Sequence, residues 1–342
     1  MKLIRFLLFP FSLLYQFITS FRNFLFNKGW LKSTSFSIPV IAVGNLNVGG
    51  TGKTPQIEYL VRLLKDTYNL AILSRGYKRK TSGFQLLNNK HTTEDVGDEP
   101  MQFFKKFQGV SVAVDANRTH GINQLQRLCQ SLNVILLDDA FQHRKVKAGL
   151  YILLTKYKDL YVDDFVLPTG NLREWRSGAK RAQVIIITKC PLNLSSTEKD
   201  KILKKINPKA NQQVFFSGID YDDELKGAST LMLDSLVNKK VVLVTGIANP
   251  NPLTTFLKEK NIVFTHIKFP DHHHFTNQDI LKIKRELLKS KSEDTVLLTT
   301  EKDYVRLHDK VLNLHYIAIK SVFLENETAF NETIVNFVEN IE

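Results

Sequence analysis

Short apolar runs separated by helical stretches dominate the chain from residue 38 onward. The first apolar runs occupy residues 40–43, 70–73, 110–114, 134–137, 151–154, 184–187 and 214–216. Each run is continuous rather than alternating, which is typical of strands buried on both faces of a parallel sheet. Helical patterns lie between the runs, for example at residues 55–66 and 122–131. This order of strands and helices predicts a doubly wound α/β fold.

A second series of apolar runs follows a polar stretch at residues 220–226. Its members occupy residues 241–244, 263–266, 296–298 and 315–319, and a helical pattern covers residues 277–290. We therefore predict three parts: an N-terminal segment at 1–30, a first α/β domain at 31–225 and a smaller α/β domain at 226–342. The last turn or two of the chain, to Glu342, also has a helical pattern and is expected to pack on either domain.

The N-terminal segment is rich in Phe, Leu and Ile, and no acidic residue occurs before Glu58. A cleaved signal peptide would end at a small-residue cleavage site, and none follows this segment. A membrane-spanning helix needs roughly 20 mostly apolar residues, whereas Pro10, Gln16 and Arg22 interrupt this run. Two interpretations remain: a helix packed on the protein's own core, and a helix lying in the membrane interface with its cations toward anionic lipid. We favour the interfacial helix.

Composition and charge indicate which kinds of partner the chain can bind, but they do not indicate its fold. The chain has 342 residues, 43% of them hydrophobic, and a formal net charge of +13. Anionic lipid, phosphorylated substrates and nucleic acid all match this charge. No aromatic and basic recognition module is evident, so nucleic acid is not an expected partner. The cysteines, Cys129 and Cys190, form no CxxC pair, which argues against a disulfide framework and against a zinc site.

The strongest motif is GNLNVGGTGKT at residues 44–54, between the first apolar run and the first helical pattern. Glycine-rich backbone in that position curls around phosphate oxygens, and the N-terminus of the following helix adds a positive dipole. Lys53 is expected to reach the β- and γ-phosphates, and the Thr54 hydroxyl to ligate Mg²⁺. The strict pattern would have glycine in place of Asn47. The predicted nucleotide-binding residues are Asn47, Val48, Gly49, Gly50, Thr51, Gly52, Lys53 and Thr54.

A pair of carboxylates follows another buried run, in the sequence VILLDD. Mg²⁺ prefers hard oxygen ligands, and in P-loop enzymes an aspartate opposite the P-loop Thr supplies one. We therefore expect Asp138 or Asp139 to hold the metal, directly or through water. Strands often end in aspartate, so this pattern predicts a metal site only in combination with the phosphate-binding motif upstream.

A kinase also needs a group that orients or deprotonates the acceptor hydroxyl, and three polar clusters are candidates. Asp98 and Glu99 in the VGDEP motif precede a helix, where they would alternatively serve as an N-cap. The sequence FPDHHHF at residues 269–275 offers a carboxylate–histidine pair, or alternatively forms a solvated loop. The basic stretch at residues 171–181 is suited to phosphates, or alternatively is solvated surface.

Three other functions fit parts of the sequence less well. A P-loop GTPase or metallochaperone-like switch would usually carry Asp two positions after Lys189, where Pro191 stands. A membrane-attached nucleic-acid-binding protein would need the recognition module that is missing here. A dinucleotide oxidoreductase would need GxGxxG spacing, which these glycines do not give, and would leave Lys53 and Thr54 without a role.

Eight motifs, in this order, resemble the tetraacyldisaccharide 4′-kinase family of lipid A biosynthesis. They are GNLNVGGTGKT, SRGYKRK, VGDEP, DDAFQHR, LREW, TGIANP, FPDHHHF and TTEKD. The resemblance runs from the N-terminal segment to at least Asp303. It implies a P-loop NTPase-like parallel sheet, a second, smaller α/β domain and an N-terminal membrane-associated helix. It also implies Mg²⁺-dependent transfer of phosphate from ATP to the 4′-hydroxyl of a tetraacylated glucosamine disaccharide 1-phosphate.

The same resemblance implies roles for individual residues. Asp98 and His272 form a catalytic pair, and which of the two takes the proton stays open. Lys53 lies on the phosphates, and Arg173 stabilises phosphoryl charge. The residues implied for Mg²⁺ are Thr54, Asp138, Asp139 and Glu174. The implied partners are the acylated lipid and a membrane surface, for a monomer bound peripherally or monotopically at the cytoplasmic face of the inner membrane.

Overall fold

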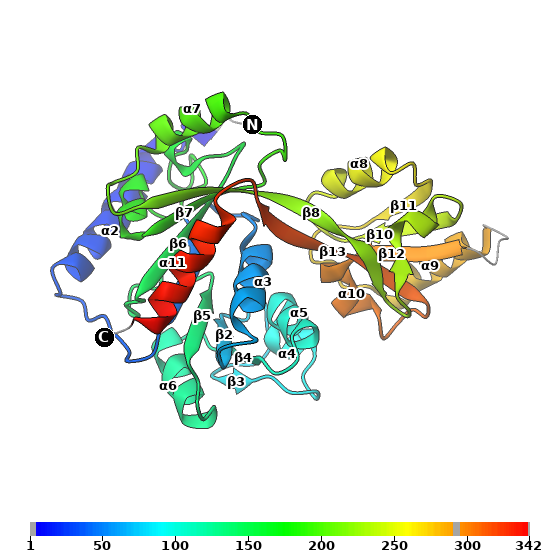
Figure 1. Cartoon of the computed structure of the whole chain (residues 1–342), viewed down its shortest axis with the longest axis horizontal. Coiled ribbons are helices and arrows are strands. Elements are labelled where there is room, and N and C mark those ends of the chain that lie inside the picture. The colour runs from blue at the N-terminus through cyan, green and yellow to red at the C-terminus, as the bar shows by residue number, and fades with distance from the viewer. Residues whose placement is uncertain (1–4, 290–294, 341–342) are drawn as a thin grey trace.

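The computed structural model describes residues 5–289 and 295–340. Figure 1 shows a larger and a smaller α/β body joined by a ribbon of two long strands. The larger body contains the first series of apolar runs, and the smaller body contains the second. Most strand pairs within each body are parallel. The structure therefore confirms the predicted α/β class with a large, mostly parallel sheet.

The larger body is built on strands in the order β8-β7-β6-β1-β5-β2-β4-β3. Up to β7 these are β1 (Val40–Asn45), β2 (Leu70–Ser74), β3 (Gln85–Leu86), β4 (Ser111–Val114), β5 (Val134–Asp138), β6 (Leu150–Lys156) and β7 (Val184–Thr188). The short edge strand β3, which the sequence pattern missed, pairs antiparallel with β4. Strands β5, β2 and β4 lie on one side of β1, and β6 and β7 on the other. The topological switch point, where ligands bind in open α/β sheets, is therefore at the carboxyl end of β1.

Helices cover both faces of this sheet, which explains why its strands are continuously apolar. Ile41 and Val43 of β1 pack into one core cluster with α3 (Lys53–Leu64). The alternate residues of β1, Val40 and Ala42, pack into another cluster with α6 (Arg118–Leu128). The remaining helices of the larger body in this part of the chain are α4 (Thr93–Val96), α5 (Asp98–Lys106) and α7 (Ser196–Ile206).

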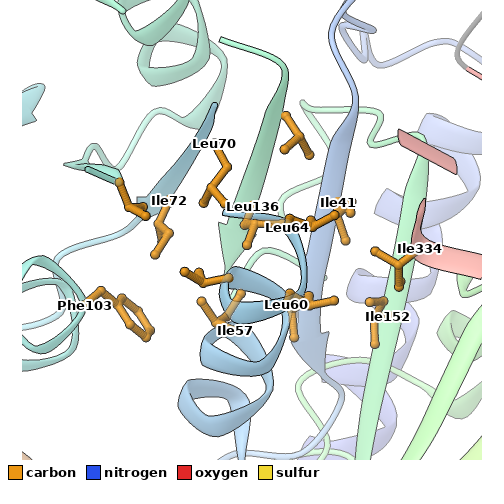
Figure 2. Close-up of a cluster of buried hydrophobic side chains, with 14 of the residues drawn as sticks. Ile41, Ile57, Leu60, Leu64, Leu70, Ile72, Phe103, Leu136, Ile152 and Ile334 are labelled. Carbon is orange, nitrogen blue, oxygen red and sulfur yellow. The ribbon is translucent and has the colours of Figure 1, made fainter. Parts of the chain in front are cut away.

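The helix after the phosphate-binding motif is anchored in the centre of the larger core. Ile57, Leu60 and Leu64 of α3 are fully buried, and Figure 2 shows them directed at strand residues such as Ile41 and Leu136. Burying one side chain of this size contributes about 1.5–3 kcal/mol. This packing fixes the N-terminus of α3, and with it the loop that the motif forms.

The ribbon between the bodies consists of β8 (Gln213–Gly227) and β13 (Leu314–Phe323). The first residues of β8 pair parallel with β7, and those from Ser217 onward pair antiparallel with β13. The boundary predicted near residue 225 therefore falls inside a strand rather than in a connection. Most residues at 220–226 are polar because they are at least partly exposed, whereas Leu225 is fully buried and packs with Tyr221 in the core of the smaller body.

The smaller body continues the sheet in the order β11-β10-β12-β13. Its elements are β9 (Leu231–Met232), β10 (Lys240–Thr245), α8 (Asn251–Glu259), β11 (Phe264–Lys268), α9 (Asn277–Lys289), β12 (Thr295–Thr300) and α10 (Glu301–Leu307). Strand β9, also missed by the sequence pattern, is a short partner of β8. The carboxyl ends of β10, β11 and β12 share one edge of the sheet, since these strands pair parallel.

The last helix, α11 (Glu327–Glu339), returns to the larger body. Phe330, Ile334 and Val338 pack in the same core cluster as α3, and Ile334 appears beside Ile152 in Figure 2. Packing therefore assigns these residues to the larger body, although they lie within the predicted 226–342 domain.

The N-terminal segment forms α2 (Phe9–Asn27), which lies along the outside of the larger body (Figure 1). On its inner side the Ser12 hydroxyl donates a hydrogen bond to Thr169 Oγ1 (2.7 Å), and the Tyr15 hydroxyl donates to the Arg173 carbonyl (2.9 Å). Apolar side chains that are about half exposed or more cover its outer side: Phe11, Leu13, Leu14, Phe17, Ile18, Phe21 and Phe24. Within residues 5–289 and 295–340, no helix has the length and apolar character needed to cross a bilayer.

A buried ion cluster joins the two bodies away from the ribbon. Lys106 Nζ in α5 lies 2.7 Å from Glu58 Oε2 in α3 and 2.7 Å from Glu301 Oε2 in α10. The side chains of Glu58 and Glu301 are only 1% and 8% exposed. Burial and the nearby charge of Glu58 raise the pKa of Glu301, while Lys106 opposes this rise. Arg62 Nη2 also lies 3.0 Å from Glu58 Oε2, so Lys106 is the cation that bonds to both buried carboxylates, one from each body.

Replacing Lys106 with methionine is expected to lower the free energy of unfolding by about 3 kcal/mol, because it leaves buried Glu301 without its bonded cation and buried Glu58 with only Arg62. Urea denaturation followed by circular dichroism measures this loss. Adding Glu301→Gln should restore part of it, since that change removes one of the two charges. A loss below about 1 kcal/mol in the single variant, the range of exposed pairs, would contradict a buried cluster.

Candidate active site

The predicted nucleotide-binding motif forms a loop between β1 and α3. Gly49 and Gly52 have φ angles of +95° and +88°, conformations that favour glycine. Open space borders the loop, since a Cβ added at Gly49 or Gly50 would meet no atom within 4 Å. Asn47 needs no such conformation, so it fits in the position where glycine is usual. It is fully buried, and its amide donates a hydrogen bond to Asp164 Oδ2 (3.2 Å).

The end of β7 holds this loop in shape. The Thr188 hydroxyl donates to the Thr51 carbonyl (2.7 Å), and Lys189 Nζ donates to the Gly50 carbonyl (2.8 Å). Two buried oxygens of the loop, Thr51 Oγ1 and Asn47 Oδ1, have no hydrogen-bond partner in the described part of the chain. Buried polar atoms without partners cost free energy, and such atoms are expected where a ligand completes the hydrogen bonding.

Lys53 and Arg173 meet at one carboxylate. Lys53 Nζ lies 3.5 Å from Asp139 Oδ1, and Arg173 donates to both oxygens of Asp139 (3.0 and 3.1 Å). Burial alone would raise the pKa of Asp139, but these two cations hold it below its usual value. The structure thus brings together three predicted site residues that lie far apart in the sequence. Two cations and a carboxylate beside a glycine-rich loop are suited to a nucleotide's phosphates and a metal ion.

Asp138, at the end of β5, is a buried acid of this site. Burial and the neighbouring charge of Asp139 raise the pKa of Asp138 to about 6, whereas Lys53 and a hydrogen bond from Ser74 lower it. Among the described residues, no group of three or more His, Cys, Asp or Glu side chains is arranged to hold a metal by itself. Protein sites usually hold Mg²⁺ through one or two carboxylates and substrate phosphates, and Asp138 and Asp139 are the two carboxylates at this site.

Glu174 lies in a different environment from the one that its predicted magnesium role requires. Its Oε1 accepts from Arg181 (2.7 Å) and Gln142 (3.1 Å), and its Oε2 accepts from Asn23 (2.6 Å) and Arg181 (3.0 Å). A carboxylate has about four lone-pair sites, so these donors occupy them. In this structure Glu174 ties the loop of Arg173 to α2, and it would bind a metal only by releasing a donor.

The structure brings Asp98 and His272 together from different bodies. His272 Nδ1 lies 2.9 Å from Asp98 Oδ2. Asp98 is the first residue of α5, so the helix dipole favours its negative charge. Burial alone would raise the pKa of Asp98, but the hydrogen bond from His272 and the charge of Arg306 hold it below its usual value. The charge of Glu99, the next residue, raises the pKa of Asp138, so the start of α5 acts electrostatically on the acid at the end of β5.

The loop after β11 fixes His272 and separates it from its neighbours. His272 has a φ angle of +56°, rare for a residue with a side chain, and its N–H donates to the Gly246 carbonyl (3.1 Å). His273 instead contacts Asp279 (2.9 Å) and stacks on Phe269. Of the adjacent histidines, His272 is therefore the one paired with Asp98, as the resemblance implies.

Sequence reasoning missed the cations that α10 adds to this pair. Lys302 Nζ lies 3.0 Å from His272 Nε2, and Arg306 Nε lies 3.6 Å from Asp98 Oδ2. Arg306 also donates to the His273 carbonyl (3.0 Å) and to Asp303 (2.9 Å), which steadies the histidine loop. The TTEKD motif follows an apolar run, so its place at the same sheet edge as the histidine loop was an available signal.

A family model described as tetraacyldisaccharide-1-P 4′-kinase matches residues 4–339 of the chain. The chain belongs to the tetraacyldisaccharide-1-P 4′-kinase family. It is 54% identical, over all of both proteins, to the tetraacyldisaccharide 4′-kinase of Flavobacterium johnsoniae. It is 44% identical to the tetraacyldisaccharide 4′-kinase of Bacteroides thetaiotaomicron, over 97% of this chain and 92% of that protein.

A solved structure shares the fold of this 4′-kinase family member. LpxK from Aquifex aeolicus, crystallised in complex with ATP, is 33% identical and superimposes with a TM-score of 0.79. The match covers 98% of this chain and 99% of that one. These comparisons confirm the family that the eight motifs indicated. The roles of individual residues within the 4′-kinase site stay predictions.

Proposed function

We propose that this chain transfers the γ-phosphate of ATP to the 4′-hydroxyl of a tetraacylated glucosamine disaccharide 1-phosphate, a late step of lipid A biosynthesis. The observation that carries the proposal is the 2.9 Å contact between Asp98 and His272, made across the two bodies. A carboxylate–histidine pair is suited to activating a hydroxyl, and a P-loop with its lysine is suited to a triphosphate. The full-length similarity to named 4′-kinases supports this acceptor.

In the proposed step, His272 takes the proton of the acceptor hydroxyl. The hydroxyl oxygen then forms a bond to the γ-phosphorus, and the bond between that phosphorus and the bridging oxygen of ADP breaks. Asp98 keeps the ring oriented and stabilises its positive charge after proton transfer. Lys53 and Arg173 present positive charge to the phosphoryl oxygens, where charge changes during transfer.

The residues at the phosphate-binding loop also fit Mg²⁺. Thr54, Asp138 and Asp139 are the proposed holders, since they supply the hard oxygen atoms that this ion prefers. Bound there with ATP, Mg²⁺ neutralises phosphate charge and orients the γ-phosphate. A nearby divalent cation would favour the charged form of Asp138, which burial otherwise disfavours.

We also propose that α2 attaches the enzyme to the cytoplasmic face of the inner membrane, peripherally or monotopically. Its inner side is hydrogen-bonded to the loop of Arg173, while its outer side presents Phe, Leu and Ile side chains. Arg22 and Lys28 lie on this segment with no acidic residue nearby in sequence, which suits anionic lipid. We further propose that the enzyme acts as a monomer, since one copy of the chain supplies every group of the proposed site.

Replacing both Leu14 and Phe17 with aspartate is expected to weaken binding to phosphatidylglycerol vesicles by at least about tenfold, because two apolar side chains no longer enter the interface. Vesicle co-sedimentation measures this change. Leu312→Asp, at an apolar residue of the smaller body that is 87% exposed, is the matched control and should leave vesicle binding unchanged. Equal binding by the double variant and the wild type would contradict membrane attachment through α2.

The reaction itself is tested with γ-labelled ATP, Mg²⁺ and the disaccharide 1-phosphate lipid in detergent. The label should appear in the lipid, at the 4′-position. Release of the label as free phosphate, with an unlabelled lipid, would contradict the proposed kinase and favour a hydrolytic P-loop switch.

A further inference from the structure

Lys302 occupies the side of His272 that faces away from Asp98. Its Nζ lies 3.0 Å from His272 Nε2, and 3.7 Å from Asp271 Oδ1. The Lys302 side chain is 26% exposed, so it is neither fully buried nor free in solvent. It follows the N-cap Thr300 of the short helix α10, whose hydroxyl accepts a hydrogen bond from the N–H of Asp303. The position of Lys302 is therefore set by the fold of the smaller body.

This contact fixes the hydrogen bonding of the imidazole ring. A lysine ammonium group can only donate, so the ring nitrogen that faces Lys302 must accept. The proton of neutral His272 then lies on Nδ1 and is donated to Asp98, which can only accept when ionised. The lone pair of Nε2 accepts from Lys302 in this structure. Nε2 is therefore the ring atom that can take a proton from an acceptor hydroxyl once Lys302 has released it.

We propose that Lys302 is a positioning residue for phosphate transfer, whose ammonium group donates to Nε2 of His272 and so keeps the proton of the neutral ring on Nδ1 until the acceptor hydroxyl replaces it. This inference rests on the proposed roles of Asp98 and His272. A neutral ring is the only form that can act as the base.

Lys302 has another partner available when the acceptor hydroxyl takes its place at Nε2. When the acceptor hydroxyl donates to Nε2, Lys302 can pair with Asp271, whose carboxylate is 40% exposed and already within 3.7 Å. The hydroxyl proton then moves to Nε2 as the oxygen bonds to the γ-phosphorus and ADP leaves. The cation stays close to the new imidazolium, so proton transfer occurs only as phosphate transfer consumes the hydroxyl.

The other charged groups around the His272 ring do not take the place of Lys302 at Nε2. The groups that face His272 or its partner are Asp98 of α5, Lys302 and Arg306 of α10, Asp271 and His273 of its own loop, and Tyr77 after β2. Arg306 contacts the Asp98 carboxylate and not the imidazole ring, so it does not replace Lys302 at Nε2. Lys302 is therefore the residue whose removal changes the charge at Nε2.

The test is the pH dependence of kcat/KM for Lys302→Met, with Lys302→Arg as the conservative variant. Removing the cation should move the acidic limb of the profile to higher pH by about one unit, because protonation of the ring is then less opposed. Lys302→Arg, which keeps the charge, should leave the limb in place. A higher KM for the lipid with an unmoved limb in Lys302→Met would overturn the proposal, and would instead make Lys302 a substrate-binding residue.

Controls separate this inference from the proposed roles on which it rests. Lys289→Met, at a lysine of the smaller body whose side chain is 71% exposed, should change neither the profile nor the unfolding temperature. Nitrogen NMR of the ring should find Nδ1 protonated and Nε2 unprotonated in the folded wild type, and the reverse tautomer would overturn the proposal. Normal turnover by His272→Ala would remove the catalytic pair itself. An inactive His272→Ala with an unmoved limb in Lys302→Met would reject Lys302 alone.

Discussion

Replacing Lys53 with alanine is expected to lower kcat about a thousandfold. Lys53 is the first residue of α3, directly beside the glycine-rich loop, and it shares Asp139 with Arg173. Removing one preorganised donor from charge that develops in a transition state typically costs about 10²–10³ in kcat. Loss of a full positive charge among phosphates places the expected effect at the upper end of that range.

Single-turnover transfer of labelled phosphate at saturating ATP and lipid measures this loss without interference from product release. Lys65→Ala is the matched control, because Lys65 lies just past the other end of the same helix and pairs only with exposed Asp66 within the ion pairs of the described chain. Its rate should equal that of the wild type. A Lys53→Ala rate within about tenfold of the wild type would mean that the phosphates bind elsewhere.

Replacing Asp98 with asparagine is expected to lower kcat by about 10²–10⁴, with a small change in KM for ATP. Asparagine has nearly the same shape, but it is neutral and its amide can donate to His272 Nδ1 instead of accepting from it. The ring then loses both the charge that stabilises its protonated form and the tautomer that leaves Nε2 free. His272→Gln should cause a loss of similar size, since it removes the base itself.

The double variant Asp98→Asn with His272→Gln distinguishes a pair from two independent residues. Groups that act as a unit are strongly non-additive, so the double variant should be little slower than either single variant. Asp66→Asn, at an aspartate whose side chain is 79% exposed, should not change the rate. Losses that multiply in the double variant would show that the two side chains act separately.

Most strands could be predicted because strands buried on both faces are continuously apolar in the sequence. Core clusters on both sides of the sheet require apolar residues at consecutive positions, as in β1 and β5. The long strand β8 is not continuously apolar at residues 220–226, because a half-exposed ribbon tolerates polar side chains. The return of α11 to the larger body depends on packing between residues distant in sequence, which no local pattern records.

The candidate site could be predicted in part from motif context. A glycine-rich loop between a strand and a helix has a local signature, and so has an aspartate after a buried strand. The pairing of Asp98 with His272 has none, since 174 residues separate them and only the resemblance connected the two motifs. The contacts of Lys302 and the four donors on Glu174 depend on tertiary packing, which explains why sequence reasoning missed them.

We propose that the acceptor hydroxyl is activated by a histidine of the smaller body held against Asp98 of the larger one. A crystal structure of the enzyme with Mg²⁺, a non-hydrolysable ATP analogue and the lipid acceptor would show this contact. We expect His272 Nε2 about 3 Å from the 4′-oxygen, with Lys302 displaced and the terminal phosphate at the Gly49–Thr54 loop. A 4′-oxygen more than about 6 Å from Nε2, with no bridging water, would contradict it.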